Sequence, residues 1–186
     1  MTSPTVPPVR RFSDDAEVAG FVVVGYLAGA REASQTFADR LERQLATVGI
    51  EQPTADDWYP ATPLQTAMFE TADAVGAETL SRAGRQTVAL VDLPPDVRRP
   101  RDVLFELDDV YDRAHRGDGS ELDEYDVPHV ADGEAVVDCV QMPYPASLVC
   151  GALSGAVDRV SSGETTVGVE QSEPEPGRLR FELSWD

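Results

Sequence analysis

The 186-residue chain has the length of one domain, and its 41% hydrophobic residues are enough for a core, which excludes disorder by composition. Its 34 acidic and 15 basic residues, the latter all Arg, give a net charge of −19. Nucleic acids are bound mainly through cations, and the chain has no basic cluster with interleaved aromatics, so we expect no nucleic-acid partner. Repulsion among so many carboxylates is screened at molar salt, where the Debye length is about 3 Å, so the composition predicts a halophile's cytoplasm.

The first part of the chain predicts an arm followed by a buried segment. Residues 1–15 are Pro-rich and lack an apolar core of the secretory type, so we expect a flexible arm before a single domain at 16–186. Residues 18–27 are rich in β-branched and aromatic side chains and predict a buried strand, although a buried helix gives the same pattern. The apolar stretch is too short to span a bilayer, so we expect no membrane association.

Three helices are expected next, each marked by its ends. Ser34 is a predicted N-cap, and Gly49 is placed to close that helix. Pro63 opens a second helix that Gly76 interrupts. A short third helix is expected to end at Gly84, with a brief extended or helical piece after it.

The second half alternates between helices and strands. An amphipathic pattern predicts one helix over residues 101–115, and Asp132-Gly133 is a hairpin turn signal between strands at 127–130 and 134–142. A small-residue helix with no charge before Asp158 is expected at 146–159.

A final hairpin is expected from residues 165–171 and 178–185. The chain thus predicts an α+β fold, with a helical N-terminal half packed on a mainly antiparallel sheet formed largely by the C-terminal half. We expect any function to lie behind the uncharged helix, and whether a cavity lies between residues 148–160 and the sheet is the most useful observation to make.

No catalytic signature is present in the chain: there is no phosphate-binding Gly-rich loop, GxSxG elbow or HExxH motif. His115, His129, Cys139 and Cys150 could together bind zinc, but they lack the close pairs typical of structural sites, so no metal is expected. His115 ends a helix, where a protonated ring interacts with the dipole, and a haem-ligand role is the chemical alternative. Cys150 fits a buried thiol better than a nucleophile.

Aromatic side chains near predicted bends are candidate pocket residues. Trp58, Tyr125 and Tyr144 flank turns, and Tyr111 lies on the apolar stripe of a helix. Each combines an apolar body with a polar tip, which suits the wall of a ligand cavity as well as a core. Both interpretations stay open from the residues alone.

The order of motifs resembles a known superfamily. Trp58-Tyr59-Pro60, Leu107 to His115-Arg116, Tyr144-Pro145 and the Cys150 to Gly155 helix occur in the order found in haem-NO-binding and 4-vinyl-reductase-like domains. The similarity covers residues 20–186 and is architectural more than chemical. It implies helices and a curved sheet that enclose an apolar pocket.

The resemblance implies a sensory or regulatory domain that binds a small hydrophobic ligand without catalysis. On this basis we expect the ligand at Trp58, Tyr111, His115, Tyr144 and Cys150. The Tyr-x-Ser-x-Arg motif and the terminal cysteines of the two better-understood branches are absent, so no haem, other cofactor or metal is expected. The alternatives are a scaffold that binds a protein partner or a second copy, and an enzyme acting through Cys150 or the histidines.

Overall fold

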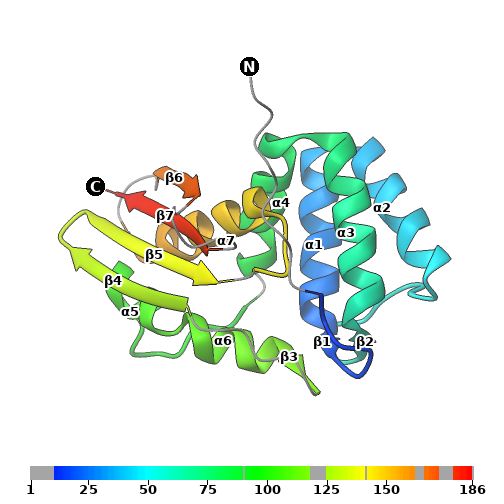
Figure 1. Ribbon diagram of the computed structural model, residues 1–186, viewed down its shortest axis with the longest axis horizontal. Helices are drawn as coiled ribbons and strands as arrows, with labels where there is room; N and C mark the ends of the chain where they lie inside the picture. The colour runs from blue at the N-terminus through cyan, green and yellow to red at the C-terminus, as the bar shows by residue number, and fades with distance from the viewer. Residues whose placement is uncertain are drawn as a thin grey trace.

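A helical part and a sheet-containing part make up the computed structural model (Figure 1). The structure describes residues 11–89, 91–117, 125–140, 142–161, 166–171 and 178–185, and the side chains of 167–171 lie outside this description. The predicted arm therefore falls mostly outside the described residues. The helices are α1 (Gly20–Ala33), α2 (Gln35–Thr47), α3 (Ala61–Val75), α4 (Ala77–Ala89), α5 (Pro100–Phe105), α6 (Leu107–Ala114) and α7 (Ala146–Asp158).

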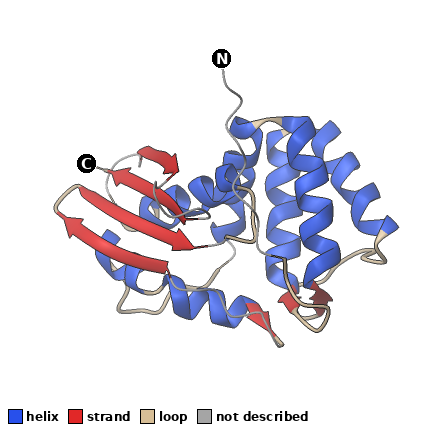
Figure 2. Cartoon of the chain, viewed as in Figure 1, coloured by secondary structure: helices blue, strands red, loops and turns tan. Residues whose placement is uncertain are grey.

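Two antiparallel sheets accompany the helices (Figure 2). The strands are β1 (Glu17–Ala19), β2 (Trp58–Pro60), β3 (His115–Arg116), β4 (Tyr125–Ala131), β5 (Glu134–Val140), β6 (Thr166–Gln171) and β7 (Arg178–Ser184). The larger sheet has the order β4-β5-β7-β6, and the smaller has the order β2-β1-β3. Helices dominate the first half and the larger sheet lies in the second, so the predicted α+β class is confirmed.

The strand predicted at residues 18–27 is wrong for most of its length. Only Glu17–Ala19 is extended, and α1 begins at Gly20. Val23, Tyr26 and Ala30 are fully buried, and half-buried apolar side chains lie between them, because α1 packs against both α2 and α4. A helix surrounded by neighbours has no polar face, so its sequence lacks the 3.6-residue alternation that would have identified it.

Several predicted helix ends are confirmed, and others are wrong. The helix expected to open at Pro63 begins at Ala61. The Ser34 hydroxyl accepts a hydrogen bond from the Phe37 N–H, and both Gly49 and Gly76 adopt positive φ after helix ends. Gly84, in contrast, lies inside α4. The single helix expected over 101–115 is divided at Glu106 into α5 and α6.

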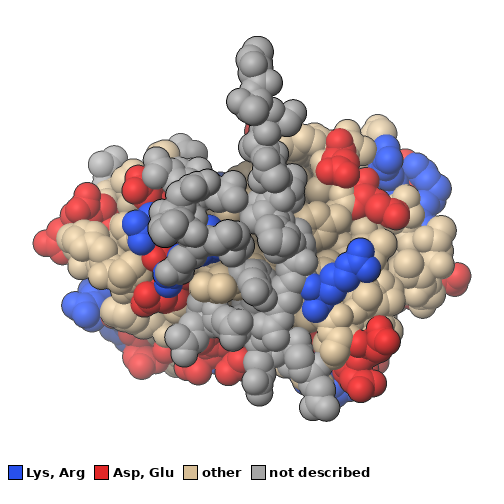
Figure 3. All heavy atoms as spheres, viewed as in Figure 1, with Lys and Arg blue, Asp and Glu red and all other residues tan. Residues whose placement is uncertain are grey.

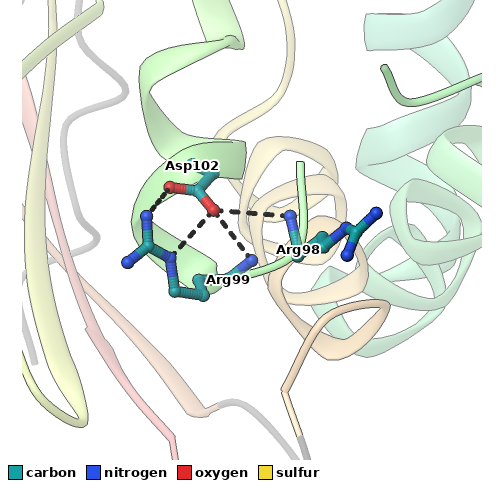
Figure 4. A network of polar contacts seen from close by, with 3 residues as sticks. All are labelled: Arg98, Arg99 and Asp102. Atoms are coloured by element: carbon teal, nitrogen blue, oxygen red, sulfur yellow. Dashed lines mark hydrogen bonds and ion pairs between the residues drawn. The ribbon is translucent and has the colours of Figure 1, made fainter. Parts of the chain in front are cut away.

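The first turn of α5 is fixed by one carboxylate. Asp102 accepts hydrogen bonds from the backbone N–H groups of Arg98 and Arg99 at 3.4 and 3.1 Å (Figure 4). It also accepts two from the Arg99 guanidinium, at 3.1 and 2.9 Å. The Arg99 hydrogen bond lowers the pKa of this carboxyl. The arginine-rich run is thus a capped helix start, which positions Val103 of α5 for the core.

The larger sheet contains a buried ion pair. Asp138 on β5 is 3% exposed, and its two oxygens accept hydrogen bonds from Arg180 on β7 at 2.9 and 2.8 Å. The Arg180 hydrogen bond lowers the Asp138 pKa, so the carboxylate stays charged although it is buried.

The turn expected at Asp132-Gly133 joins β4 and β5, with Gly133 at φ 87°.

Acidic side chains appear on both the helical part and the sheet-containing part of the face drawn in Figure 3, with arginines among them. Among the described residues, no helix is long and apolar enough to cross a membrane. On this face, charged side chains are thus spread over both parts of the fold.

Candidate functional site

Three helices cross with their backbones in direct contact. A Cβ atom added at Gly84 of α4 would lie 2.0 Å from the Leu148 carbonyl oxygen of α7. One added at Gly151 of α7 would lie 1.8 Å from the Ser81 carbonyl oxygen of α4, and one at Gly29 of α1 would lie 2.4 Å from the Cα of Ala83. The small residues of α7 thus allow α4 to approach its backbone closely.

A cavity of about 150 Å³ lies beside this crossing. Its wall is mostly aliphatic and aromatic and is drawn from α1, α3, α4, α5, α6 and α7. Among the described residues that line the cavity, Tyr125 comes from the larger sheet. Five residues of α7 line the cavity. Val149 and Leu153 are two of them and also pack with strands β5 and β7, whereas most of the remaining wall comes from other helices.

His115 is the most highly connected polar residue of the wall. Its Nδ1 lies 2.8 Å from the Tyr111 carbonyl oxygen, which can only accept, so Nδ1 carries the proton. In the neutral ring Nε2 is then an acceptor, and it receives the hydrogen bond donated by the Tyr144 hydroxyl. Both ring nitrogens are consequently engaged within the protein.

Burial keeps this imidazole neutral. His115 is 7% exposed, and desolvation lowers its pKa to about 4. Desolvation likewise raises the pKa of the Tyr144 hydroxyl, so the phenol keeps the proton that it donates. Near neutral pH the His115 ring is therefore uncharged, so the expected interaction of a protonated His115 with the helix dipole does not occur.

Aromatic rings lie against both His115 and its partner. The Tyr111 ring stacks on the imidazole with centroids 3.8 Å apart, and the Phe12 ring stacks on it at 5.6 Å. Phe12 also meets the Tyr144 ring edge-on at 6.0 Å and is 6% exposed. The Thr62 hydroxyl donates to the Phe12 carbonyl oxygen at 3.0 Å. The end of the predicted arm is thus packed against the outside of the cavity wall.

Three of the five residues expected to bind ligand lie together at the cavity, namely Tyr111, His115 and Tyr144. Trp58 lies elsewhere, on β2 of the smaller sheet, where the Arg116 guanidinium covers its ring at 4.2 Å. Cys150 is half-buried on α7 and packs with the sheet-side cluster, outside the cavity lining.

The two cysteines show no sign of reactivity. Burial raises the pKa of the Cys150 thiol to about 11, and burial raises that of Cys139 as well. Thiolate, not thiol, is the nucleophile and metal ligand, so both side chains behave as small apolar groups. In the described part of the chain, no three His, Cys, Asp or Glu side chains gather as a metal site would need.

Sequence reasoning missed the α1 and α4 walls of the cavity. Tyr26 lies on α1, is fully buried and lines the cavity, and Val88 on α4 lines it too. Tyr26 was hidden because residues 18–27 suggested a strand. The spacing of Val22 and Tyr26, four residues apart as on one helical face, was the signal that could have revealed it.

Comparison with known proteins gives a likeness of structure only. No family model matches the chain, and no curated protein matches it. Among solved structures, a Cs H-NOX (haem-NO-binding) variant containing 4-cyano-L-phenylalanine is 17% identical, with a TM-score of 0.64 over 90% of this chain and 96% of that one.

Two further structures give the same result. An Fe(II) unliganded H-NOX variant from K. algicida is 12% identical, with a TM-score of 0.61 over 90% of this chain and 96% of that one. An oxygen-binding H-NOX domain related to soluble guanylate cyclases, in its oxygen complex, is 17% identical, with a TM-score of 0.59 over 90% and 94%. Identity this low carries information about the backbone alone. The chain has the H-NOX fold.

Proposed function

We propose that this chain is a sensory or regulatory domain that binds a small, mainly apolar molecule in the cavity between α1, α4, α6 and α7. The observation that carries the proposal is the cavity itself, which is about 150 Å³ in volume and almost entirely apolar in its wall. A dry cavity of that size accommodates a molecule such as benzene. The H-NOX fold adds support, because one structural neighbour is described as oxygen-binding.

The cavity does not fit haem, the group named for one of the structural neighbours. A porphyrin is several times larger than benzene, so it would need a much larger cavity. Because α4 and α7 are in backbone contact at Gly84 and Gly151, the cavity could enlarge only if this contact were broken. His115 has both nitrogens engaged and rings stacked on it, so it offers no free ligand atom. The proposed ligand is therefore a small molecule bound by packing.

The direct test is a titration of the protein with benzene in concentrated salt, followed by amide chemical shifts in two-dimensional NMR. We expect saturable shifts confined to residues around the cavity. Ala152→Leu, which adds a side chain at the cavity wall, should abolish them. Ala74→Leu, on the exposed face of α3, is the matched control and should leave them intact. Val88→Phe fills the same cavity from α4 and serves if Ala152→Leu does not fold.

Two results would overturn the proposal. One is the absence of saturable shifts in the folded wild-type protein, and the other is binding that survives both cavity-filling substitutions. The haem argument has its own test, in which the protein is incubated with haemin and its absorption spectrum recorded. A stoichiometric Soret band that His115→Gln removes would show that the cavity opens to accept the group after all.

A further inference from the structure

The cavity reaches the protein surface at the C-terminal end of α7. Among the described residues of its wall, Arg159 is the one that is exposed, and all the others are buried or half-buried. Arg159 directly follows the last residue of α7. Val88, near the end of α4, and Val91, just after α4, also line the cavity and are half-buried. The wall therefore meets solvent where the ends of α4 and α7 come together.

The Arg159 guanidinium lies across this opening. Its Nη1 donates to the Val88 carbonyl oxygen at 2.8 Å and to the Val91 carbonyl oxygen at 2.6 Å. The Val91 N–H donates to the Val88 carbonyl oxygen as well, at 3.2 Å, so the turn after α4 is closed on itself and then tied to Arg159. The side chain thus connects α7 to the opposite side of the opening by hydrogen bonds alone.

Arginine commonly caps the last carbonyl groups of a helix, which is a purely structural role. The same two helices, however, have a second polar link in the ion pair between Arg85 of α4 and Asp158 of α7. Neither of these two is among the described residues that line the cavity. Because the ion pair and the glycine crossing already join the helices, the Arg159 hydrogen bonds can break without separating α4 from α7.

Arg159 is also the part of the wall that moves most easily. Both of its hydrogen bonds are exposed, so water can replace them when the side chain rotates, and exposed side chains rotate within nanoseconds. Most other described wall residues lie on helices that pack against one another, and displacing them would disturb that packing. The route that costs least for a small molecule therefore passes the guanidinium.

We propose that ligands enter and leave the cavity past Arg159, and that its hydrogen bonds to Val88 and Val91 keep this entrance closed and limit the rate of exchange. This inference rests on the function proposed above. It adds how access to the same site is regulated: the apolar wall determines how tightly a ligand binds, and the arginine determines how fast it enters and leaves.

The test is Arg159→Met, which removes every donor and keeps an unbranched side chain. Benzene is titrated into both proteins in concentrated salt, and NMR line shapes with relaxation dispersion give the association and dissociation rate constants. Entry and exit use the same opening, so weaker closure raises both rate constants equally. We expect both to rise about tenfold, while the dissociation constant changes by less than about twofold.

Two further variants make the test specific. Arg159→Lys keeps a donor for the two carbonyl oxygens, so its rate constants should lie between those of the wild type and Arg159→Met, and it replaces Arg159→Met if that variant does not fold. Arg85→Gln is the matched control, because it breaks the other polar link between α4 and α7 away from the cavity. It should lower the stability and leave both rate constants at the wild-type values.

The outcomes separate this inference from the proposed function. If benzene binds wild-type and Arg159→Met proteins with the same rate constants, ligands do not pass Arg159, although the cavity binds. An equal rise in Arg85→Gln would assign the rate to loosening of the helix pair and would also overturn the inference. So would a change in the dissociation rate constant alone, since Arg159 would then contact the ligand. If benzene does not bind the folded wild-type protein, the proposed function itself fails.

Discussion

The crossing of α4 with α7 and the cavity beside it are opposite extremes of packing within one set of helices. At the crossing, Gly84 and Gly151 leave no space even for a methyl group. Immediately next to it, Gly84, Leu148 and Ala152 border an opening of about 150 Å³. The same two helices are therefore as close as backbones can be at one point and separated at the next.

This difference explains how a cavity persists in a folded protein. Cavities are destabilising, and their neighbours normally relax inward to reduce the loss. Here α4 and α7 are already in backbone contact, so neither helix can move toward the other as a rigid body. The crossing acts as a spacer that holds the cavity open, and the following substitutions test that relationship.

The largest effect is expected from Gly151→Ala. Its Cβ would lie 1.8 Å from the Ser81 carbonyl oxygen, so α4 and α7 must separate. We expect a loss of more than about 3 kcal/mol in the free energy of unfolding, measured by urea denaturation at constant high salt. Gly49→Ala meets no atom within 4 Å but has φ +84°, so it reports backbone strain alone, about 1 kcal/mol. Equal losses in the two variants would contradict the spacer.

A smaller loss of stability is expected when the His115 ring is protonated. Burial lowers the His115 pKa from 6.5 to about 4, so the folded state favours the neutral ring. The folded protein therefore has its full stability above pH 6.5. Its free energy of unfolding decreases as the pH falls toward 4, by about 3 kcal/mol in total. Unfolding free energies measured over this range should fall more steeply for wild-type protein than for His115→Gln.

His129 provides the control for that experiment, because it is exposed on β4. His129→Gln removes the other imidazole and leaves the buried His115 in place, so its profile should retain the steep fall attributed to His115. A His115→Gln profile parallel to that of the wild type would show that this ring is accessible to protons in the folded state, and that this side of the wall is looser than the crossing.

Tyr26→Phe should stabilise the unliganded protein by about 1 kcal/mol, because it removes a buried hydroxyl that has no partner among the described residues. Thermal and urea unfolding of the two proteins measure this difference. A loss of stability of similar size would mean that the hydroxyl is already satisfied in the free protein. The surroundings of Tyr26 beside the cavity would then be better packed than the cavity volume suggests.

The smallest effect is expected from Ala152→Leu, which places apolar atoms in the cavity. We expect a gain of about 0.5 kcal/mol, since the added burial is partly offset by imperfect fit. Ala74→Leu should change stability by less than that, because the side chain is exposed. A substantial loss in Ala152→Leu would indicate that this part of the wall has no more room than the crossing.

Local signals in the sequence predicted the fold class, the hairpin turn at Gly133, both ends of α2 and the C-terminal end of α3 correctly, because each depends on a few neighbouring residues. The resemblance to haem-NO-binding domains is confirmed at the level of fold. The strand expected at residues 18–27 failed because α1 is enclosed by other helices and therefore lacks a polar face. Gly84 suggested a helix end, whereas the close approach of α7 is what requires a glycine there.

The candidate site was only partly predictable for the same reason. Tyr111, His115 and Tyr144 lie near helix ends and bends, which sequence patterns mark well, and all three line the cavity. Trp58 also lies next to a bend, but its ring is covered by Arg116 on the smaller sheet. Whether a bend faces inward depends on how distant segments pack, and no local pattern encodes that.

The glycine crossing also has a consequence for how such a domain can diverge. Positions 84 and 151 accept no side chain, whereas the neighbouring wall position 152 carries one that borders the cavity. A substitution that reshapes the cavity there is thus separate from the glycines that hold the helices together. A lineage built on this crossing could exchange one ligand for another through single side-chain changes while its architecture stays constant.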